Sequence, residues 1–528
     1  MPYNAVICVV AALTVAHKLV RVGLCARYGR LLSLLSGVSG PKINRGDMKD
    51  QAFNPYLPNW EYVHDGEPHE FDGRIYVYGS HDRFDGSSFC LNDYVCWSCP
   101  SDDLSDWRYE GVIFRKTDDP KNKRRRKPLY APDVCRGADG KYYLYYFVMF
   151  DGVIGVARCD TPCGRFEHIG YVRHPDGTLY GKKKGDIFQF DPAVYAEDGK
   201  TYLYTGFALV HFPFFLTGGK PITRKGPMCA ELDADMLTVK RADYIGVECK
   251  RSGNGTPYEG HEFFEAASMR KINGRYYFIY SSYLGHELCY AVSDRPDGGF
   301  EYGGTIVSIG DVGLRGIKGV KDAANFCGNT HGSICRDAYG NYYIFYHRQT
   351  NRHCFSRQGC AERIDVAPDG HIQQTEVTSC GLNGRPLVGL GEYPSAIACN
   401  ITCKKGGKFY WVFKTRSRPY LTQSGVDRED RPDQYVANVR DGTCVGFKYF
   451  DLSCGASSIS VRVRGNADGM LTVSDGTKTV AEIPIALRRG AESEFSARLD
   501  ADGVKPLFFE YGGSGKLDLM SFRLEKSV

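Results

Sequence analysis

Five segments of the chain repeat one pattern, and this repetition constrains the fold more than any other feature of the sequence. Each segment holds the start of a strand, a turn that usually ends in Gly, and an aromatic-rich second strand. The segments read DGEPHEFDGRIYVYGS, PDVCRGADGKYYLYYF, DPAVYAEDGKTYLYTGF, EAASMRKINGRYYFIYSS and HGSICRDAYGNYYIFYH. Asp-Gly at 72–73, 139–140 and 198–199 and Asn-Gly at 273–274 are hairpin signals, because both central residues of such turns need positive φ. We therefore expect each segment to form a β-hairpin.

A second motif follows three of these segments and adds another pair of strands. It reads CPSDDLSDWRYEGVIF, ARCDTPCGRFEHIGYV and AVSDRPDGGFEYGGTIV, in each case a strand, a turn and a strand. Two hairpins make a four-stranded unit, and the five units begin roughly 60 to 75 residues apart. We therefore predict an all-β chain that forms a five-bladed β-propeller of four-stranded blades. A β-sandwich with coincidental repeats is the alternative.

Length and composition agree with this fold class. The chain has 528 residues, 13% aromatic residues and 61 Gly, as expected for a β-rich protein of two or three domains. We expect no membrane and no nucleic-acid partner, because no run of eighteen apolar residues follows the N-terminus and the net charge is only +5. One basic cluster is expected to be a solvated loop; its members are Lys121, Lys123, Arg124, Arg125, Arg126 and Lys127.

The twenty cysteines lack the regular spacing of a disulfide framework or a zinc module. Cys96 and Cys99 have the spacing of a redox or metal pair, but the alternation of a strand would place them on opposite faces. We therefore expect reduced, mostly buried thiols.

Residues 1–47 differ from the rest of the chain and contain the short apolar run AVICVVAALTVA without a preceding basic region. A secretory signal is one interpretation. We favour the other, an N-terminal extension ahead of Met48 that is not part of the folded protein, and with it a cytoplasmic enzyme. The propeller is then expected over residues 48–380.

The residues that head the five repeats carry the functional signal. They are Asp65, Asp133, Asp191, Glu265 and His331. The first strand of a propeller blade lies nearest the central axis, so these side chains can project into one axial cavity. Four carboxylates brought together repel one another, and burying unpaired charge is costly. A functional site explains this ring better than a structural core does.

A ring of carboxylates suits glycoside hydrolysis. One acid protonates the leaving oxygen and one base activates water, while a third carboxylate can keep the pKa of the acid high by repulsion. A His on the same axis could hold a metal or bind sugar hydroxyls, although a lone His is more often a satisfied core residue.

With these motifs in this order, the chain resembles glycoside hydrolase family 43, the five-bladed propellers that cleave arabinose and xylose linkages with inversion. The resemblance runs from NPYLPNWEY at Asn54 to CAERIDVAPDG at Gly370. It implies that Asp65 in HDGEP is the general base and that Asp191 in FDPAV modulates the pKa of the acid. It implies that Glu265 in FFEAAS is the general acid, where the family commonly shows Glu-Gly-Pro. Glu259 in YEGHEF is the rival for this role.

The resemblance implies further site residues. Asp133 in APDV helps to form the substrate pocket, with structural support as the alternative role. Arg357 in FSRQ reaches the sugar, which suits a planar multidentate donor, or else lies at the surface. His331 in THGS is the axial histidine that binds calcium largely through waters in many members, and calcium prefers six to eight oxygen ligands. No organic cofactor is expected.

The hairpin pattern ends after Gly370, and a linker-like stretch of Gly, Pro and polar residues follows at 381–395. Alternating segments such as SISVRVRG and LDLMSFRLE then predict a β-sandwich, a jelly roll, over residues 395–528. This region resembles family 6 carbohydrate-binding modules. Sugar binding there needs exposed rings, for which Trp411, Tyr410, Tyr420 and Tyr435 are the candidates, and packing on the propeller is the alternative role.

The expected function is an inverting, exo-acting hydrolase that releases L-arabinofuranose or D-xylose from plant-derived oligosaccharides or polysaccharides. A non-catalytic propeller that binds carbohydrate is the alternative from another class, because fold does not imply function. Endo-acting arabinanase activity is the alternative within the enzyme class.

Overall fold

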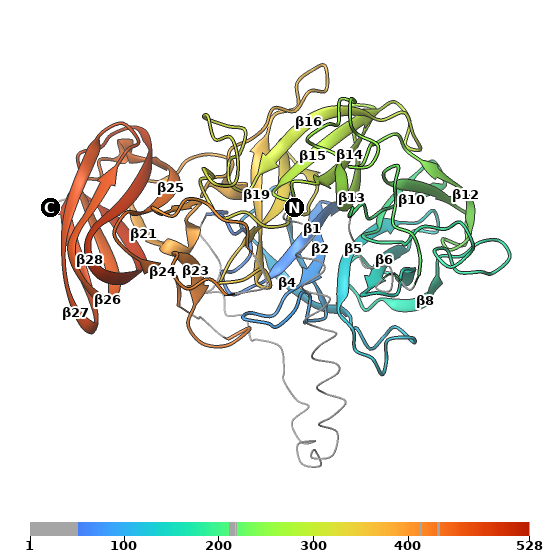
Figure 1. Cartoon of the computed structure of the whole chain (residues 1–528), viewed down its shortest axis with the longest axis horizontal. Coiled ribbons are helices and arrows are strands. Elements are labelled where there is room, and N and C mark those ends of the chain that lie inside the picture. Colours follow the sequence, from blue (N-terminus) through green and yellow to red (C-terminus); the bar gives the residue numbers. More distant parts are fainter. Residues whose placement is uncertain (1–50, 211–216, 218, 411–413, 430–432, 527–528) are drawn as a thin grey trace, which may run out of the picture.

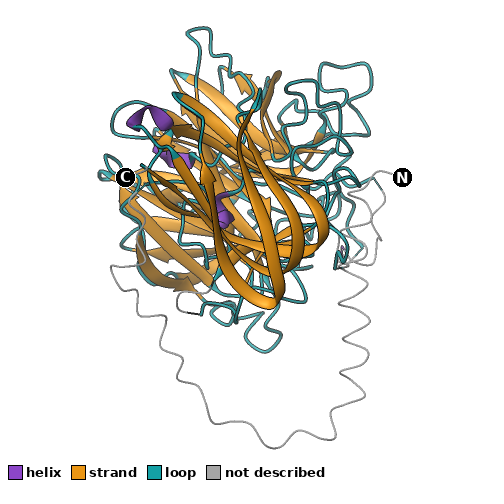
Figure 2. Ribbon diagram, turned by 90° about the vertical axis from the view of Figure 1, so that its left-hand side faces the viewer, coloured by secondary structure: helices purple, strands orange, loops and turns teal. Residues whose placement is uncertain are grey.

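The computed structural model describes residues 51–210, 217, 219–410, 414–429 and 433–526. The expected N-terminal extension, 1–47, and Trp411 lie outside the described residues. Figure 1 shows a propeller of small sheets beside a C-terminal sheet of long strands. Strands dominate the described chain and the helices are short, as Figure 2 shows. No helix in the described ranges is both long and apolar enough to cross a membrane.

Four blades contain four strands each, in the order in which they occur along the chain. Blade one comprises β1 (Val63–Phe71), β2 (Arg74–His81), β3 (Tyr94–Pro100) and β4 (Arg108–Phe114). Blade two comprises β5 (Leu129–Arg136), β6 (Tyr142–Val148), β7 (Ile154–Cys159) and β8 (Glu167–Tyr171). Blade three comprises β9 (Ala193–Glu197), β10 (Lys200–Thr205), β11 (Met228–Leu232) and β12 (Val239–Tyr244). Blade four comprises β13 (Phe263–Ile272), β14 (Arg275–Ser282), β15 (Glu287–Ser293) and β16 (Glu301–Ser308).

The hairpin signals mark the turns between the first two strands of these blades. Asp72 and Gly73 have φ values of 52° and 83°, and Asn273 and Gly274 have 50° and 85°. Both central residues of these two turns are thus left-handed, as the mirror-image hairpin turns require. At the turn of blade two the expectation is met only by Gly140, with φ of 78°, because Asp139 does not have positive φ. The prediction of a five-bladed, all-β propeller is confirmed.

The fifth blade corrects the expectation of four strands per blade. In the described residues it holds three, β17 (Ile334–Arg336), β18 (Tyr342–Gln349) and β19 (Arg357–Ile364). The free edge of β19 is covered by one side chain from the start of the propeller. The amide of Asn54 donates to the carbonyl of Ala361 over 2.9 Å and accepts from the N–H of Ala361 over 2.9 Å. This pairing imitates a neighbouring strand, satisfies the edge and joins the two ends of the propeller.

Among the described residues, the C-terminal strands form one nine-stranded sheet. Its elements are β20 (Leu387–Val388), β21 (Gly391–Pro394), β22 (Asn400–Thr402), β23 (Tyr420–Gln423), β24 (Gln434–Val439), β25 (Thr443–Asp451), β26 (Ser458–Ser474), β27 (Thr479–Arg498) and β28 (Val504–Glu525). Short 3-10 helices η3 (Gly381–Asn383), η4 (Ser395–Ile397) and η5 (Leu452–Cys454) punctuate it. The segments SISVRVRG and LDLMSFRLE, which were expected as short strands, are parts of the longer strands β26 and β28. β28 pairs with β21, β24, β25 and β26 and holds the sheet together around one apolar core.

The stretch expected to be a linker is part of this sheet, because β20 pairs with β25 and β21 pairs with β28. The C-terminal region also contacts blade one. Arg428 donates to both carboxylate oxygens of Glu61 over 2.9 Å, and Tyr62 donates to Oε1 of Gln423 over 2.7 Å. These buried polar contacts show that the C-terminal region packs on the propeller. The exact boundaries of the domains stay a prediction.

The described cysteines are all free thiols, and most are buried. Cys96 and Cys99 contribute to two different apolar clusters, as the alternation of a strand requires. The basic cluster lies in the connection between β4 and β5, where Lys123, Arg124 and Arg125 are exposed. The expectation of a solvated basic loop is confirmed. The burial of most described thiols agrees with the other expectation.

Candidate active site

A β-bulge places Asp65 at the head of blade one. His64 pairs with Ser80 and Glu67 with Tyr78, so Asp65 and Gly66 together oppose the single residue Gly79. Asp65 is left-handed, with φ of 52°. A bulge of this kind bends the strand and redirects a side chain. Glycine is needed at 79, since an added Cβ would lie 2.3 Å from the carbonyl oxygen of His64.

Basic side chains surround the carboxylate of Asp65, which is only 7% exposed. Nε2 of His64 lies 3.2 Å from Oδ2, Nδ1 of His347 lies 3.3 Å from Oδ1, and Nη1 of Arg357 lies 3.6 Å from Oδ1. Burial alone would raise the pKa of Asp65, but the charges of His64 and Arg357 together hold it well below its usual range. Asp65 is therefore ionised at neutral pH.

The same kind of bulge occurs at the head of blade four. Glu265 pairs with Ser281 and Ser268 with Ile279, which leaves Ala266 and Ala267 opposite one residue. Ala266 is left-handed, with φ of 65°, so its N–H leaves the strand ladder. That N–H donates to Oδ2 of Asp191 over 3.2 Å.

The environment raises the pKa of Glu265 and of Asp191. Burial is the largest cause for Glu265, and the charges of Asp191 and Asp65 raise its pKa further, well above the usual range. Burial raises the pKa of Asp191 to about 7, helped by Asp65 and opposed by His331. The Glu265 and Asp191 pair therefore keeps a proton at pH values where Asp65 has none.

Arg357 connects Asp65 to a second buried carboxylate, Asp82, which lies in the connection between β2 and β3. Nε and Nη2 of Arg357 donate to the two oxygens of Asp82 over 2.9 and 3.1 Å, and its guanidinium lies 4.5 Å from the ring centre of Phe89. Such a bidentate pair fixes the plane of the guanidinium. Arg357 is 2% exposed. It therefore lies in the buried site and not at the surface, which was the other expectation.

His331 also lies at this centre and is buried. Its Nε2 is 3.4 Å from Oε1 of Glu67, and neither atom has another hydrogen-bond partner among the described residues. Burial would lower the pKa of His331, but the hydrogen bond to Glu67 and the charges of Asp65 and Asp191 raise it to about 9. These two buried atoms without hydrogen-bond partners fit the ligands of a cation whose remaining ligands are waters. A protonated His331 imidazole beside the Glu67 carboxylate fits the same position.

Asp133 lies near the axis but its carboxylate is fully occupied by protein atoms. Its Oδ1 accepts from Nε2 of His69 over 2.6 Å and from the N–H of Val134 over 2.8 Å. Its Oδ2 accepts from the N–H of Val194, in blade three, over 2.7 Å. With no exposed surface, the side chain joins three blades. This geometry favours the structural role that the sequence also allowed, and not contact with substrate.

Glu259, the rival for the acid role, is exposed and accepts from the N–H of Gly255 in a local turn over 2.9 Å. The register of the hairpin therefore indicates Glu265. The sequence analysis missed His64, His347 and Asp82, which shape the charge of Asp65. His64 precedes Asp65 directly, His347 lies near the end of the aromatic-rich strand β18, and Asp82 directly follows β2, so the ends of those strands were an available signal.

Taken together, one buried centre holds an ionised carboxylate, a carboxylate pair that keeps a proton, and a fixed guanidinium. This is the equipment of acid and base catalysis by two carboxyl groups. A model of glycosyl hydrolases family 43 matches residues 70–372. The chain belongs to glycosyl hydrolase family 43. It is a glycoside hydrolase.

One relative of this family 43 hydrolase covers 90% of its length, and two others cover about 60% of it. It is 50% identical over 483 residues to a xylosidase/arabinosidase of Thermoclostridium stercorarium, which covers 90% of this chain and 99% of the relative. It is 30% identical over 346 residues to a β-xylosidase of Xylanibacter ruminicola, covering 59% of this chain and 96% of the relative. A solved family 43 β-xylosidase/α-arabinofuranosidase from a compost metagenome, in complex with xylotriose and in a calcium-free form, is 26% identical with a TM-score of 0.44, covering 64% and 98% of the two chains.

Proposed function

We propose that this family 43 hydrolase releases L-arabinofuranose or D-xylose from the ends of oligosaccharides, with inversion at the anomeric carbon. The observation that carries the proposal is the opposite shift of two pKa values in one buried centre, that of Asp65 downward and that of Glu265 upward. The names of the relatives support the choice of pentose, since the relative at 50% identity is a xylosidase/arabinosidase.

In the proposed reaction, protonated Glu265 donates its proton to the glycosidic oxygen as the bond to the anomeric carbon breaks. Ionised Asp65 accepts a proton from a water that attacks the same carbon from the opposite face. Asp191 raises the pKa of Glu265 and is tied to its strand through the N–H of Ala266. Arg357, with Nη1 beside Asp65, is placed to donate to a sugar hydroxyl. An inverting enzyme needs the two carboxyl groups roughly 6.5 to 9.5 Å apart, to leave room for the water.

Substitution of Glu265 tests this assignment. Glu265→Gln should lower kcat/KM on xylobiose and on arabino-oligosaccharides by about 10²- to 10⁴-fold, because the leaving oxygen then lacks a proton donor. Nitrophenyl pentosides, which have a good leaving group, should lose less. Glu259→Gln is the matched control and should keep full activity.

The stereochemistry is tested by proton NMR of the first product formed, which should have the anomeric configuration opposite to that of the substrate. Undiminished activity of Glu265→Gln on every substrate would remove Glu265 from the acid role. A parent protein that hydrolyses no pentoside but binds oligosaccharides would favour the binding propeller.

We also propose that a calcium ion binds at His331. Nε2 of His331 and Oε1 of Glu67 would hold the ion together with waters. A bound ion supplies positive charge beside the carboxylates. Removal of calcium with EGTA should lower the melting temperature, and calcium added back should restore it while magnesium should not. If neither EGTA nor added calcium changes the melting temperature, the positive charge beside the carboxylates comes from protonated His331 and not from calcium.

A further inference from the structure

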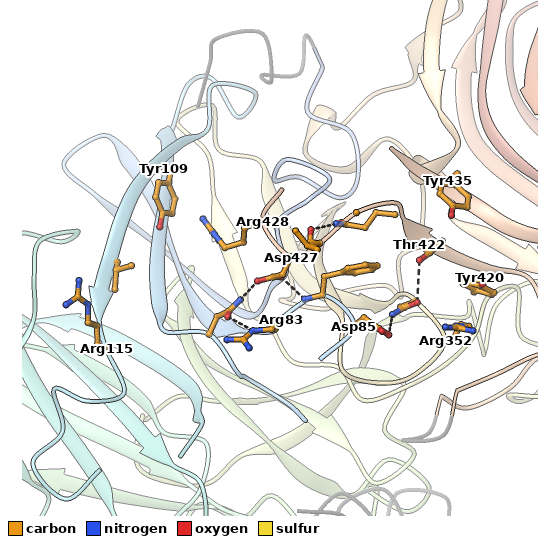
Figure 3. Close-up of a pocket in the computed structure, with 17 residues that line it drawn as sticks. Arg83, Asp85, Tyr109, Arg115, Arg352, Tyr420, Thr422, Asp427, Arg428 and Tyr435 are labelled. Carbon is orange, nitrogen blue, oxygen red and sulfur yellow. Dashed lines mark hydrogen bonds between the residues drawn. The ribbon is translucent and has the colours of Figure 1, made fainter. Parts of the chain in front are cut away.

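A cavity of about 1110 Å³ lies between the propeller and the C-terminal region. Its walls come from three parts of the chain that are distant in sequence. Blade one supplies residues on β4 and on the connection between β2 and β3, and the connection between β18 and β19 supplies Asn351 and Arg352. The C-terminal region supplies Tyr435 and residues between Tyr420 and Arg428. Figure 3 shows Tyr109 and Arg115 at one end of this cavity and Tyr420, Tyr435 and Arg352 at the other. The cavity is about as large as the largest pockets that bind small ligands.

The charge of this cavity is unbalanced. Four arginines and two aspartates line it: Arg83, Arg115, Arg352, Arg428, Asp85 and Asp427. The aspartates are satisfied by other groups. Asp85 accepts from Nζ of Lys414 over 2.6 Å and contacts Nε2 of His353 at 3.1 Å, and Asp427 accepts from the side chain of Asn92 and from the N–H of Phe84.

Of the four arginines, only Arg428 has a carboxylate partner among the described residues, Glu61 at 2.9 Å. Arg83 donates to the neutral Asn92 over 3.4 Å, and Arg352 lies 5.8 Å from the ring centre of Tyr420. Arg115 lines the cavity with its side chain exposed. Three guanidinium groups are thus available to an anionic ligand, and a guanidinium matches the two oxygens of a carboxylate.

Aromatic rings accompany these arginines. Tyr109, Tyr420 and Tyr435 line the cavity and are each partly exposed. Their faces can stack on the apolar faces of sugar rings, and their hydroxyls can bond to sugar hydroxyls. Tyr420 and Tyr435 are two of the rings that the sequence analysis named as candidates for a sugar platform. Tyr410, the third described candidate, is buried and donates to the carbonyl of Asn351 over 2.9 Å.

The cavity wall is close to the catalytic centre. Asp82 is bound by Arg357, which contacts Asp65, and Asp85, three residues further along, already lines the cavity. Three residues of extended chain span at most about 11 Å. The N–H of Asp85 also donates to Oγ of Ser356, the neighbour of Arg357, over 3.1 Å. An oligosaccharide that leaves the catalytic centre on this side would reach the cavity within a few sugar units.

We propose that this cavity binds a carboxylate-bearing sugar, a uronic acid unit on the oligosaccharide, through Arg83, Arg115 and Arg352. The inference deepens the proposed function, because it names the class of polysaccharide whose ends the enzyme meets. It rests on the proposed function only for the sugar nature of the ligand, and binding can be measured without catalysis.

The test is calorimetric titration of two matched oligosaccharides into the full chain carrying Glu265→Gln, which prevents hydrolysis. One is xylotriose substituted with a single glucuronic acid, and the other is neutral xylotetraose. We expect the acidic oligosaccharide to bind at least tenfold more tightly in low salt and the preference to shrink at 0.5 M NaCl, because screening weakens the contact between exposed charges.

Substitution of the arginines shows which residues cause the preference for the acidic oligosaccharide. Arg83→Gln, Arg115→Gln and Arg352→Gln should each reduce it, and the triple variant should abolish it while the affinity for xylotetraose stays within twofold. Arg498→Gln, an exposed arginine on β27, is the control and should leave the preference intact. Equal binding of the two oligosaccharides by the parent, or a preference that survives the triple substitution, overturns the inference. A preference found in a chain that hydrolyses no pentoside would overturn the proposed function and leave this inference standing.

Discussion

The backbone N–H of Ala266 donates to Oδ2 of Asp191 over 3.2 Å, so the strand that carries Glu265 is tied to the carboxylate of the neighbouring blade. The donor is free because the bulge at Ala266 removes it from the ladder between β13 and β14. One local irregularity therefore orients Asp191 and brings its charge beside Glu265. The pKa of Glu265 depends on this pairing.

Removing the charge of Asp191 should change the pH profile of the enzyme. Asp191→Asn keeps an oxygen for the N–H of Ala266 but loses the charge that raises the pKa of Glu265. Glu265 then gives up its proton more easily, so the alkaline limb of kcat/KM should move to lower pH. The rate should also fall, by about 10- to 100-fold. Initial rates on xylobiose or an arabino-oligosaccharide between pH 4 and 9 measure both effects, and an alkaline limb at unchanged pH would contradict the assigned role.

The same substitution should stabilise the fold at high pH. The pKa of Asp191 is about 7 in the folded chain and 3.8 in the reference state, so the folded state binds this proton more tightly. Its contribution to stability is present below the unfolded pKa and is lost as pH rises through the folded value. Asp191→Asn should therefore gain roughly 2 to 4 kcal/mol over the parent at pH 8 and little at pH 4. Thermal unfolding at both pH values measures this, with exposed Asp198→Asn of the same blade as the control. An equal gain at both pH values would speak against titration of Asp191 as the cause.

Arg357 should control the acid limb. Arg357→Lys keeps a positive charge but cannot donate to both oxygens of Asp82 and lie beside Asp65 at once. The pKa of Asp65 should rise toward its usual value, so the acid limb of kcat/KM should move to higher pH and activity should fall at least tenfold. Arg363→Lys is the matched control, since Arg363 is exposed on the same strand, β19. Full activity with an unchanged acid limb would show that Arg357 has no influence on Asp65.

Asp133 should prove to be structural. Asp133→Ala leaves the N–H groups of Val134 and Val194 and the ring of His69 without their acceptor. Each unsatisfied buried donor costs about 1 to 3 kcal/mol, so a loss of roughly 3 to 5 kcal/mol in stability is expected. KM, measured below the unfolding transition, should be unchanged. Asp502→Ala, at an exposed position, is the control for stability. A large rise in KM with unaltered stability would instead place Asp133 in contact with substrate.

Much of the propeller could be predicted from the sequence because its signals are local. The turn pairs at Asp72-Gly73 and Asn273-Gly274 define their hairpins within a few residues, and the aromatic second strands define the inner part of each blade. The heads of the strands follow from the same register. Asp65, Asp191 and Glu265 could therefore be chosen before their surroundings were known.

The fifth blade and the C-terminal sheet were less predictable. The free edge of β19 is covered by Asn54, about 300 residues earlier in the chain, and no local pattern announces this contact. The long strands β26 and β28 contain glycines in their interiors, and Gly469 and Gly513 lie opposite each other in the sheet. Their added Cβ atoms would clash with the facing backbone, so close approach of two strands explains these glycines.

The sequence by itself determined the repeat, the hairpin register and the carboxylates at the strand heads, because these depend on backbone preferences and side-chain alternation over short stretches. Only the tertiary structure decided what each carboxylate does. Asp65 loses its proton and Asp133 becomes a brace because of partners from other blades, and Arg357 meets Asp82 across 275 residues of chain. The charge, burial and hydrogen-bond partners of each carboxylate depend on residues from several blades. In this chain those residues come together only when the five blades form the closed propeller.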